Sequence, residues 1–379
     1  MSVTPTDPFG VYVHIPFCAH RCHYCDFATW TDREHLMTQY VDACVSDLHR
    51  HRGAGTPVAT SVFFGGGTPS LMAAEELVRV LDAVERTADA EVTVECNPDS
   101  VDAQKLVTYH SAGVNRVSFG VQSMQPHVLE ALGRTHDVDN VKRAVAMSRG
   151  AGFERVSVDL IYGAAGESVA DWKATLEAAI ALEVDHVSAY ALTVEAGTPL
   201  DRRVETGELS APDDDDQAEK YILADDMLRA AGFGWYEISN WARSGQACRH
   251  NLLYWEQGEY LGIGCAAHGH LGGIRSWNVR TPDRYIDAVE AGRSPVAGSE
   301  ILDEVIRDDE KLTLAIRLRG GIDLRMAGLV GAAVDAQVQA LVDAGLLTRS
   351  GDRAVLTLRG RLLGNDVTTR LLALREGAT

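Results

Sequence analysis

Val11-Tyr-Val-His-Ile-Pro-Phe-Cys-Ala-His-Arg-Cys-His-Tyr-Cys-Asp-Phe27 is the stretch that decides the fold of this chain. Its apolar start, Val11 to Ile15, is typical of a short buried strand. Cysteines then follow with the spacing C-x3-C-x2-C, at Cys18, Cys22 and Cys25. Three thiolates leave a tetrahedral zinc site one ligand short, but they can hold three irons of a [4Fe-4S] cubane. The spacing therefore predicts a cluster whose fourth iron is open to a ligand, at the strand end where barrel-like α/β enzymes place their chemistry.

Two other interpretations of these cysteines stay open. A neighbouring histidine (His14, His20 or His23) could complete a Cys3His zinc site. A structural disulfide is the second option. The chain has seven cysteines, an odd number, and its N-terminal residues lack the basic and apolar regions of a secretory leader, so we expect no disulfide framework.

Composition limits the class of protein. A chain of 379 residues with 46% hydrophobic content can bury one large core and still supply a second domain. No apolar run approaches the roughly 18 residues that would indicate a membrane span. Scattered cysteines suit the reducing cytoplasm. The net charge of −19 argues against a nucleic-acid partner, because binding to phosphate backbones needs clustered Lys and Arg.

Short β-rich runs alternate with amphipathic helical stretches over the first half of the chain. This alternation predicts βα units, a parallel sheet and an open, incomplete α/β barrel. The predicted strands are Val11–Ile15, Ser61–Phe64, Val92–Glu95, Arg116–Phe119, Arg155–Ile161 and His186–Leu192. The predicted helices between them include Leu36–His51, Ala73–Arg86, Val138–Ala151 and Val169–Leu182.

The chain divides into three predicted parts. Residues 1–245 form the barrel with its N-terminal cysteine loop, and residues 246–295 are a connecting segment rich in Gly, His and Trp. Residues 296–379 form a smaller C-terminal α/β domain of winged-helix-like type, with a predicted strand at Arg353–Leu358 and a final helical stretch beyond Asn365.

Polar residues at the ends of successive predicted strands indicate a shared ligand. Glu95, Gln122 and Asp159 each lie in or beside an apolar strand, where an unpaired polar group is costly. A Gly-rich turn, Gly65-Gly-Gly-Thr-Pro69, follows the second strand and lets the backbone approach a ligand closely. Arg134 could supply a guanidinium fork for a carboxylate, although a surface cation is the simpler interpretation.

These motifs resemble those of radical S-adenosylmethionine (SAM) enzymes, and within them the group related to oxygen-independent coproporphyrinogen III oxidase. The resemblance covers nearly the full length. It is carried by Tyr12-Val-His-Ile-Pro-Phe-Cys18, Gly65-Gly-Gly-Thr-Pro69, Gly120-Val-Gln122, Asp159-Leu-Ile-Tyr-Gly163 and Leu356-Thr-x-x-Gly360. It implies a partial (β/α)6 barrel that holds a [4Fe-4S] cluster, with SAM bound to the unique iron.

The resemblance also implies which residues contact SAM. They are Tyr12, Tyr24, Gly66, Gly67, Thr68, Glu95, Gln122, Arg134, Asp159 and Thr193. Among them, Gly66 to Thr68 would meet the methionyl end and Arg134 its carboxylate. Glu95, Gln122 and Asp159 would contact the ribose or a second ligand.

The chain departs from the oxidase after the cysteine triad, because Phe27 stands where the oxidase has a further cysteine. Only eleven residues precede Tyr12, so we also expect the oxidase's extra N-terminal segment to be missing. The Cys-Asp-Phe sequence and the H-N-x-x-Y-W motif from His250 to Trp255 are similar to the HemW branch, a group of haem chaperones. Histidine is a common ligand of haem iron. His250 is therefore the first candidate, with a buried hydrogen-bonding role as its alternative, and His268 is a weaker one.

Two activities stay open on this resemblance. The first is a haem chaperone with a [4Fe-4S] cluster, SAM and haem that passes haem to an acceptor protein. The second is an enzyme that decarboxylates coproporphyrinogen III to protoporphyrinogen IX. Either would draw electrons from a donor of the reduced flavodoxin or ferredoxin type if SAM is cleaved. We expect no nucleic-acid partner and no membrane-spanning segment. Peripheral contact with membrane haem proteins is compatible with both expectations.

Overall fold

The computed structural model describes residues 7–376 and is organised around a 12-stranded sheet. The strand order is β12-β11-β10-β9-β1-β2-β3-β4-β5-β6-β8-β7, in which β9 and β1 to β6 run parallel. All the predicted parallel strands are present, as β1 (Phe9–Ile15), β2 (Ala59–Gly66), β3 (Arg86–Cys96), β4 (Arg116–Gln122), β5 (Arg155–Tyr162) and β6 (His186–Ala191). The predicted α/β class is thus confirmed.

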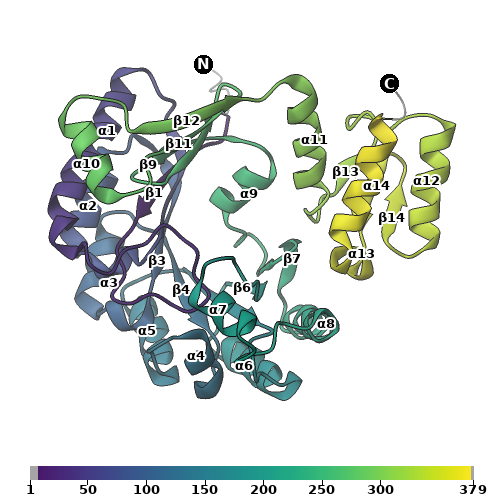
Figure 1. Cartoon of the computed structure of the whole chain (residues 1–379), viewed down its shortest axis with the longest axis horizontal. Helices are drawn as coiled ribbons and strands as arrows, with labels where there is room; N and C mark the ends of the chain where they lie inside the picture. Colours follow the sequence, from purple (N-terminus) through teal and green to yellow (C-terminus); the bar gives the residue numbers. More distant parts are fainter. Residues whose placement is uncertain (1–6, 377–379) are drawn as a thin grey trace.

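Helices cover the outer side of the parallel strands, where they form an arc around the sheet (Figure 1). Their apolar side chains and those of the strands make one large core, which includes Val13, Val62, Val94 and Leu176. The helices are α1 (Met37–Gly53), α2 (Ala74–Ala83), α3 (Ala103–Ser111), α4 (Pro126–Leu132), α5 (Val138–Gly150), α6 (Val169–Ala181), α7 (Pro199–Glu205) and α8 (Asp214–Ala230). Short 3-10 turns lie at Glu34–Leu36, Pro69–Leu71 and Pro98–Ser100.

The sheet continues beyond β1 and β6 with strands that the sequence did not indicate. Next to β1 lies β9 (Glu259–Ile263), followed by the antiparallel strands β10 (His268–Leu271), β11 (Ile274–Asn278) and β12 (Val296–Ile301). At the other edge, β8 (Asn240–Ala242) and β7 (Gly234–Glu237) add an antiparallel pair. Helices α9 (Arg249–Trp255) and α10 (Pro282–Glu290) flank β9 to β11 in the chain.

A second, smaller unit follows β12 and lies to one side of the large sheet (Figure 1). Its antiparallel sheet has the order β13-β15-β14, and its core includes Leu312, Val338, Leu347 and Leu371. The helix–strand–helix–strand–strand order agrees with the predicted winged-helix-like type. Its elements are α11 (Glu304–Ala315), β13 (Ile322–Asp323), α12 (Ala332–Asp343), β14 (Leu347–Ser350), β15 (Arg353–Leu356), α13 (Leu358–Leu362) and α14 (Gly364–Glu376).

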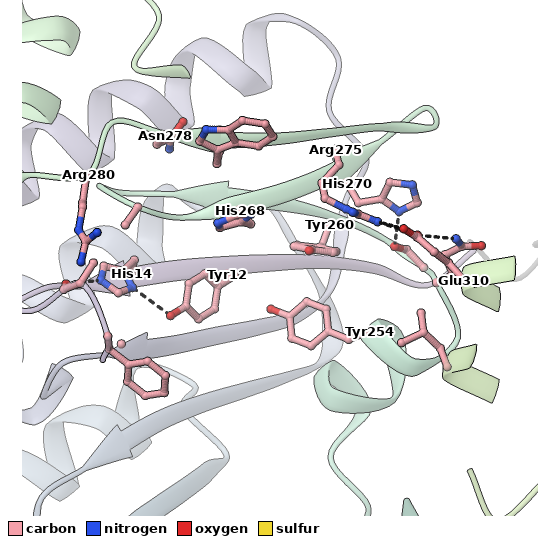
Figure 2. A pocket seen from close by; sticks show the side chains of 18 of the residues that line it. Tyr12, His14, Tyr254, Tyr260, His268, His270, Arg275, Asn278, Arg280 and Glu310 are labelled. Carbon is pink, nitrogen blue, oxygen red and sulfur yellow. Dashed lines mark hydrogen bonds and ion pairs between the residues drawn. The ribbon is translucent and has the colours of Figure 1, made fainter. Parts of the chain in front are cut away.

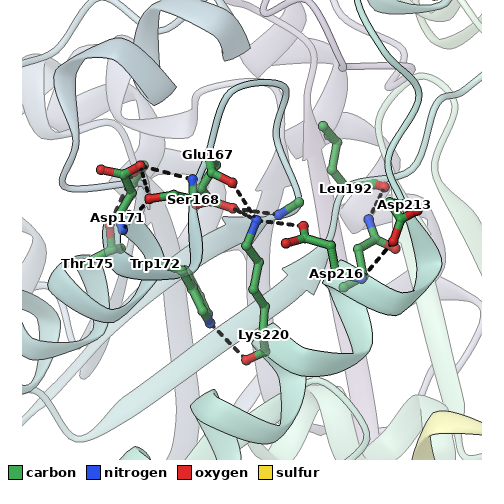
Figure 3. Close-up of polar contacts among 12 residues, drawn as sticks. Glu167, Ser168, Asp171, Trp172, Thr175, Leu192, Asp213, Asp216 and Lys220 are labelled. Atoms are coloured by element: carbon green, nitrogen blue, oxygen red, sulfur yellow. Dashed lines mark hydrogen bonds and ion pairs between the residues drawn. The ribbon is translucent and has the colours of Figure 1, made fainter.

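A buried lysine fastens α8 to the loop between β5 and α6 (Figure 3). The ammonium of Lys220, whose side chain is fully buried, lies 3.2 Å from the Glu167 carboxylate and 2.7 Å from that of Asp216. It also donates to the Glu167 carbonyl oxygen at 2.8 Å. Burial of a charge is costly unless the charge is paired and hydrogen-bonded, and here both conditions hold.

Within residues 7–376, no helix combines the length and the apolar content needed to cross a membrane.

Candidate functional site

A cavity of about 880 Å3, hereafter the inner cavity, brings the predicted site residues together. Its size falls in the range of about 300–1,000 Å3 that is usual for ligand pockets. The lining includes the three cysteines of the N-terminal loop, His250, and every residue predicted to contact SAM: Tyr12, Tyr24, Gly66, Gly67, Thr68, Glu95, Gln122, Arg134, Asp159 and Thr193. They come from different strands because the carboxyl ends of parallel strands meet at one edge of the sheet.

The cysteine loop is held against the Gly-rich turn by backbone hydrogen bonds. Gly67 N–H donates to the Ile15 carbonyl at 2.7 Å, and Thr68 N–H donates to that of Phe17 at 2.8 Å. A Cβ on Gly67 would lie only 2.7 Å from the Phe17 oxygen and 3.0 Å from Cys18 Sγ. Glycine is required at this position because two backbone segments pass so close to each other.

The donors around the cysteines suit thiolates. Thr68 Oγ1 lies 3.6 Å from Cys18 Sγ, and the Arg134 guanidinium lies 3.4 Å from Cys22 Sγ. Without a ligand, burial raises the pKa of the Cys18 thiol and that of Cys25, the latter to about 11. Among residues 7–376, no three His, Cys, Asp or Glu side chains converge closely enough to hold one metal ion. A cubane cluster does not require the three thiolates to meet at one metal ion, because each thiolate ligates its own iron. Three half-buried thiols on one loop are compatible with such a cluster.

Two carboxylates at the strand ends face the inner cavity. Glu95 accepts a hydrogen bond from Gly66 N–H at 3.2 Å, and burial, aided by the nearby negative Asp159, raises its pKa to about 8. Asp159 accepts hydrogen bonds from the hydroxyls of Ser118 (2.9 Å) and Ser188 (2.7 Å), while burial raises its pKa. Both carboxylates are therefore held in place before any ligand arrives.

Arg134 keeps one donor unused. Its guanidinium donates to the Gly120 carbonyl oxygen and to Cys22 Sγ, while Nε is buried and has no hydrogen-bond partner within the described residues. An unsatisfied buried donor carries a desolvation cost, which a carboxylate ligand would remove. This unused donor is suited to a carboxylate ligand.

The other predicted contacts lie around these groups. Gln122 ends β4 at a β-bulge with a left-handed backbone (φ 64°). Tyr24 is half-buried against the apolar cluster that contains Leu132 and Leu200, and Thr193 is exposed just after β6.

His250 lies in the first turn of α9 and is buried, with both ring nitrogens occupied. Nδ1 lies 2.9 Å from the Ser61 hydroxyl, and Nε2 lies 2.9 Å from that of Tyr254. The ring stacks on Phe63, with the two centroids 5.4 Å apart, and burial lowers its pKa to about 3. In this geometry neither nitrogen is available to iron, so the buried hydrogen-bonding role, which the sequence left open, is the one observed.

His268 does not line the inner cavity. It lines a neighbouring cavity of about 790 Å3, hereafter the outer cavity (Figure 2). The two cavities share one wall, made by Tyr12, Asp26, Phe27, Gly66, Glu95 and Tyr254. Sequence reasoning missed most of the outer lining, which includes His14, Tyr260, His270, Arg275, Trp277 and Arg280. The alternation in His268-Gly-His270 and Arg275-Ser-Trp277 was the available signal, since side chains two apart on a strand share a face.

Comparisons with known proteins agree with this arrangement. Residues 12–179 match the model of the radical SAM superfamily. The protein named "Heme chaperone HemW" of Mycobacterium tuberculosis (strain ATCC 25618 / H37Rv) is 45% identical over 98% of this chain and 97% of its own length. The protein of the same name in Bacillus subtilis (strain 168) is 34% identical over 94% of this chain and 97% of its own length. The one in Escherichia coli (strain K12) is also 34% identical, over 97% of this chain and 98% of its own length.

Among solved structures, the coproporphyrinogen III oxidase HemN of Escherichia coli, titled a radical SAM enzyme, matches with a TM-score of 0.83. The match covers 97% of this chain and 91% of that one at 21% identity, which establishes a common fold and no more. The end-to-end sequence similarity to the curated relatives is what identifies the family. The chain belongs to the HemW family of the radical SAM superfamily.

Proposed function

We propose that this protein is a haem chaperone that works in the cytoplasm on a radical-SAM scaffold. It binds haem and a [4Fe-4S] cluster with SAM at the open iron, and it delivers haem to an acceptor protein. The observation that carries the proposal is the similarity, over almost the whole chain, to relatives named heme chaperones. Phe27, in place of the cysteine expected of the oxidase, agrees with it.

In this proposal the inner cavity holds the cluster and SAM. Cys18, Cys22 and Cys25 ligate the cluster, which supplies an electron for SAM cleavage when reduced by a donor of the flavodoxin or ferredoxin type. The unused Nε–H of Arg134 donates to the methionyl carboxylate. The backbone from Gly66 to Thr68 meets the methionyl end of SAM.

The remaining contacts in the inner cavity complete the SAM site. Glu95, Gln122 and Asp159 face the ribose or a second ligand, and Tyr12, Tyr24 and Thr193 complete the walls. Hydrogen bonds already hold the carboxyl groups of Glu95 and Asp159 in position, so these two side chains are ordered before a ligand binds.

Parallel measurements on one sample test the proposal. Protein reconstituted anaerobically with iron and sulfide is titrated with haem, and the same sample is incubated with SAM, reductant and coproporphyrinogen III. We expect stoichiometric haem binding and no vinyl product. Vinyl product from a protein that does not bind haem would replace the chaperone with the decarboxylase.

Delivery needs its own test. Haem-loaded protein is mixed with a haem-depleted cytochrome, and the Soret band of the recipient is followed with and without a reduced flavodoxin. A membrane-bound recipient tests peripheral contact with membrane haem proteins. If haem reaches the recipient no faster than it is released spontaneously, the protein stores haem and does not deliver it.

A further inference from the structure

The outer cavity is bounded by one face of β9, β10 and β11. His268 and His270 are two residues apart on β10, so their side chains leave the same face of the strand. The strand register pairs His268 with Trp277, and His270 with both Arg275 and Tyr260. Directly paired residues point to the same side of a sheet. Two imidazoles, a phenol, an indole and a guanidinium therefore project into one cavity.

The histidines around the two cavities differ in whether their ring nitrogens are occupied. In the inner cavity, His20, His186 and His250 all make ring hydrogen bonds. In the outer cavity, His14 bonds the Tyr12 hydroxyl and the Ala28 carbonyl, and His270 bonds the Gly258 carbonyl. The exposed His268 ring makes no hydrogen bond to any residue between 7 and 376. His270 also keeps one nitrogen, Nε2, without a partner among the described residues, but that atom is buried and the ring is already fixed through Nδ1. Among the histidines that line the outer cavity, His268 is the exposed one, with both ring nitrogens free to ligate a metal.

Flat aromatic side chains form the walls beside His268. The Trp277 indole lies against Gly298, where a Cβ would approach it to 2.5 Å, so glycine makes room for the ring. The ring centroids of Trp277 and His268 are 6.1 Å apart, and Tyr254 packs edge-on against Tyr260 at 4.7 Å. Such walls suit a planar aromatic ligand.

The two arginines that line the outer cavity differ in whether their guanidinium groups are paired with carboxylates. Arg275 is already paired with Glu300 at 2.7 Å and with Glu310 at 2.6 Å. Arg280 is exposed and forms neither an ion pair nor a side-chain hydrogen bond with the residues that the structure describes. In Figure 2, Arg280 lies at one end of the cavity, His268 near the middle, and Arg275 with Glu310 at the other end. An unpaired guanidinium on a chain of net charge −19 is a ready partner for a ligand carboxylate.

We propose that the outer cavity is the haem site, with His268 as the ligand of the haem iron and Arg280 as the partner of a haem propionate. This inference rests on the proposed function and gives it a location. Because Tyr12, Glu95 and Tyr254 stand between the cavities, haem and SAM occupy adjoining spaces at the same time. His250 then supports the wall of the site and does not bind iron.

Replacing the proposed iron ligand tests the site. Haem titrations compare the full-length protein with His268→Ala and with His49→Ala, a control at another exposed histidine on α1. We expect His268→Ala to shift the Soret band and to bind haem at least tenfold more weakly, whereas the control behaves like the parent. Added imidazole should restore the parent spectrum in His268→Ala, because it fills the vacated ligand position. A purely structural role for His268 would not give this rescue.

The propionate partner is tested with haem and haem dimethyl ester, which lacks both carboxylate charges. The parent should prefer haem over the ester by at least fivefold, and Arg280→Gln should lose most of that preference. If the parent binds haem while His268→Ala keeps its affinity and spectrum, the site lies elsewhere and the chaperone proposal stands. If the parent binds no haem at all, the chaperone proposal itself fails.

Discussion

The imidazole of His250 lies 2.9 Å from the hydroxyl of Tyr254, one turn later on α9. Tyr254 lines both cavities, and the other nitrogen of His250 contacts Ser61 on β2. The H-N-x-x-Y-W motif thus ties α9 to the barrel and fixes the tyrosine in the shared wall. In this structure the histidine of the motif positions another residue.

Loss of that contact should destabilise the protein. His250→Ala leaves a cavity and two unpaired hydroxyls, on Ser61 and Tyr254, so we expect a loss of about 2–4 kcal/mol in the free energy of unfolding. Tyr254→Phe leaves no cavity but strips His250 Nε2 of its partner, so it should cost about 1–3 kcal/mol, less than His250→Ala in the same protein. Urea denaturation of both variants measures the difference. A stable His250→Ala protein with an altered Soret band would instead assign iron ligation to this histidine.

The cysteines separate into a metal-binding group and a structural group. Cys18→Ser, and equally Cys22→Ser or Cys25→Ser, should lose most of the iron after anaerobic reconstitution, because three ligands leave none to spare. Cys44→Ala is the matched control, since Cys44 lies on α1 with its side chain buried in the core and lines neither cavity, and its iron content should be unchanged. The iron, zinc and sulfide contents of each variant are measured together with its visible absorption spectrum. Zinc without sulfide in the parent protein would support the alternative Cys3His site.

Much of the fold and of the inner cavity was predictable because the responsible signals are local in sequence. The central parallel strands are mostly buried and are rich in apolar and β-branched residues, as in Val62-Phe-Phe64 and Val92-Thr-Val94. The ends of such strands converge, which is why the sequence alone assigns Glu95, Gln122 and Asp159 to one site, and all three line the inner cavity. The cysteine spacing needs only a loop of eight residues.

The rest depends on contacts between distant parts of the chain. Strands β10 and β11 are short and carry His, Arg and Trp on the face that lines the outer cavity, so they lack the apolar signal of a strand. The occupied state of His250 depends on Ser61, 189 residues earlier in the chain. No motif could show that a side chain on β2 already takes the nitrogen that a metal would need.

Arg134 should control SAM affinity. Arg134→Lys keeps the positive charge but loses the fork, and Arg134→Gln loses both. A hydrogen bond between charged groups contributes about 1.5–3 kcal/mol, which corresponds to roughly 10- to 150-fold weaker SAM binding in Arg134→Gln. Arg143→Gln, on the exposed side of α5, is the control and should bind SAM normally. Calorimetric titration of the reconstituted proteins gives the affinities, with iron content checked because Arg134 also contacts Cys22.

Glu95 should make the stability of the ligand-free protein depend on pH. Its pKa is raised from 4.5 to about 8 in the folded state, so the folded protein holds this proton more tightly than the unfolded chain does. The resulting stability is fully present below about pH 4.5 and is lost as the pH rises through about 8. Glu95→Gln, which stays neutral, should lose less stability than the parent between pH 6 and pH 8.5. If the free energy of unfolding changes with pH in the same way for both proteins, the Glu95 carboxyl is already ionised at pH 6 in the folded state.

The buried pair of Lys220 and Glu167 should be the most sensitive charged contact outside the cavities. Lys220→Met leaves the Glu167 carboxylate buried without its cation, and such a break typically costs about 3–5 kcal/mol. Lys173→Met, in the exposed pair with Glu177, should cost about 0.5 kcal/mol or less. Adding Glu167→Gln to Lys220→Met should recover part of the loss, because the amide oxygen can still accept from Gly163 N–H. Thermal and urea unfolding measure all three. Equal losses at positions 220 and 173 would mean that water reaches Lys220 and that α8 is held to the barrel by apolar packing alone.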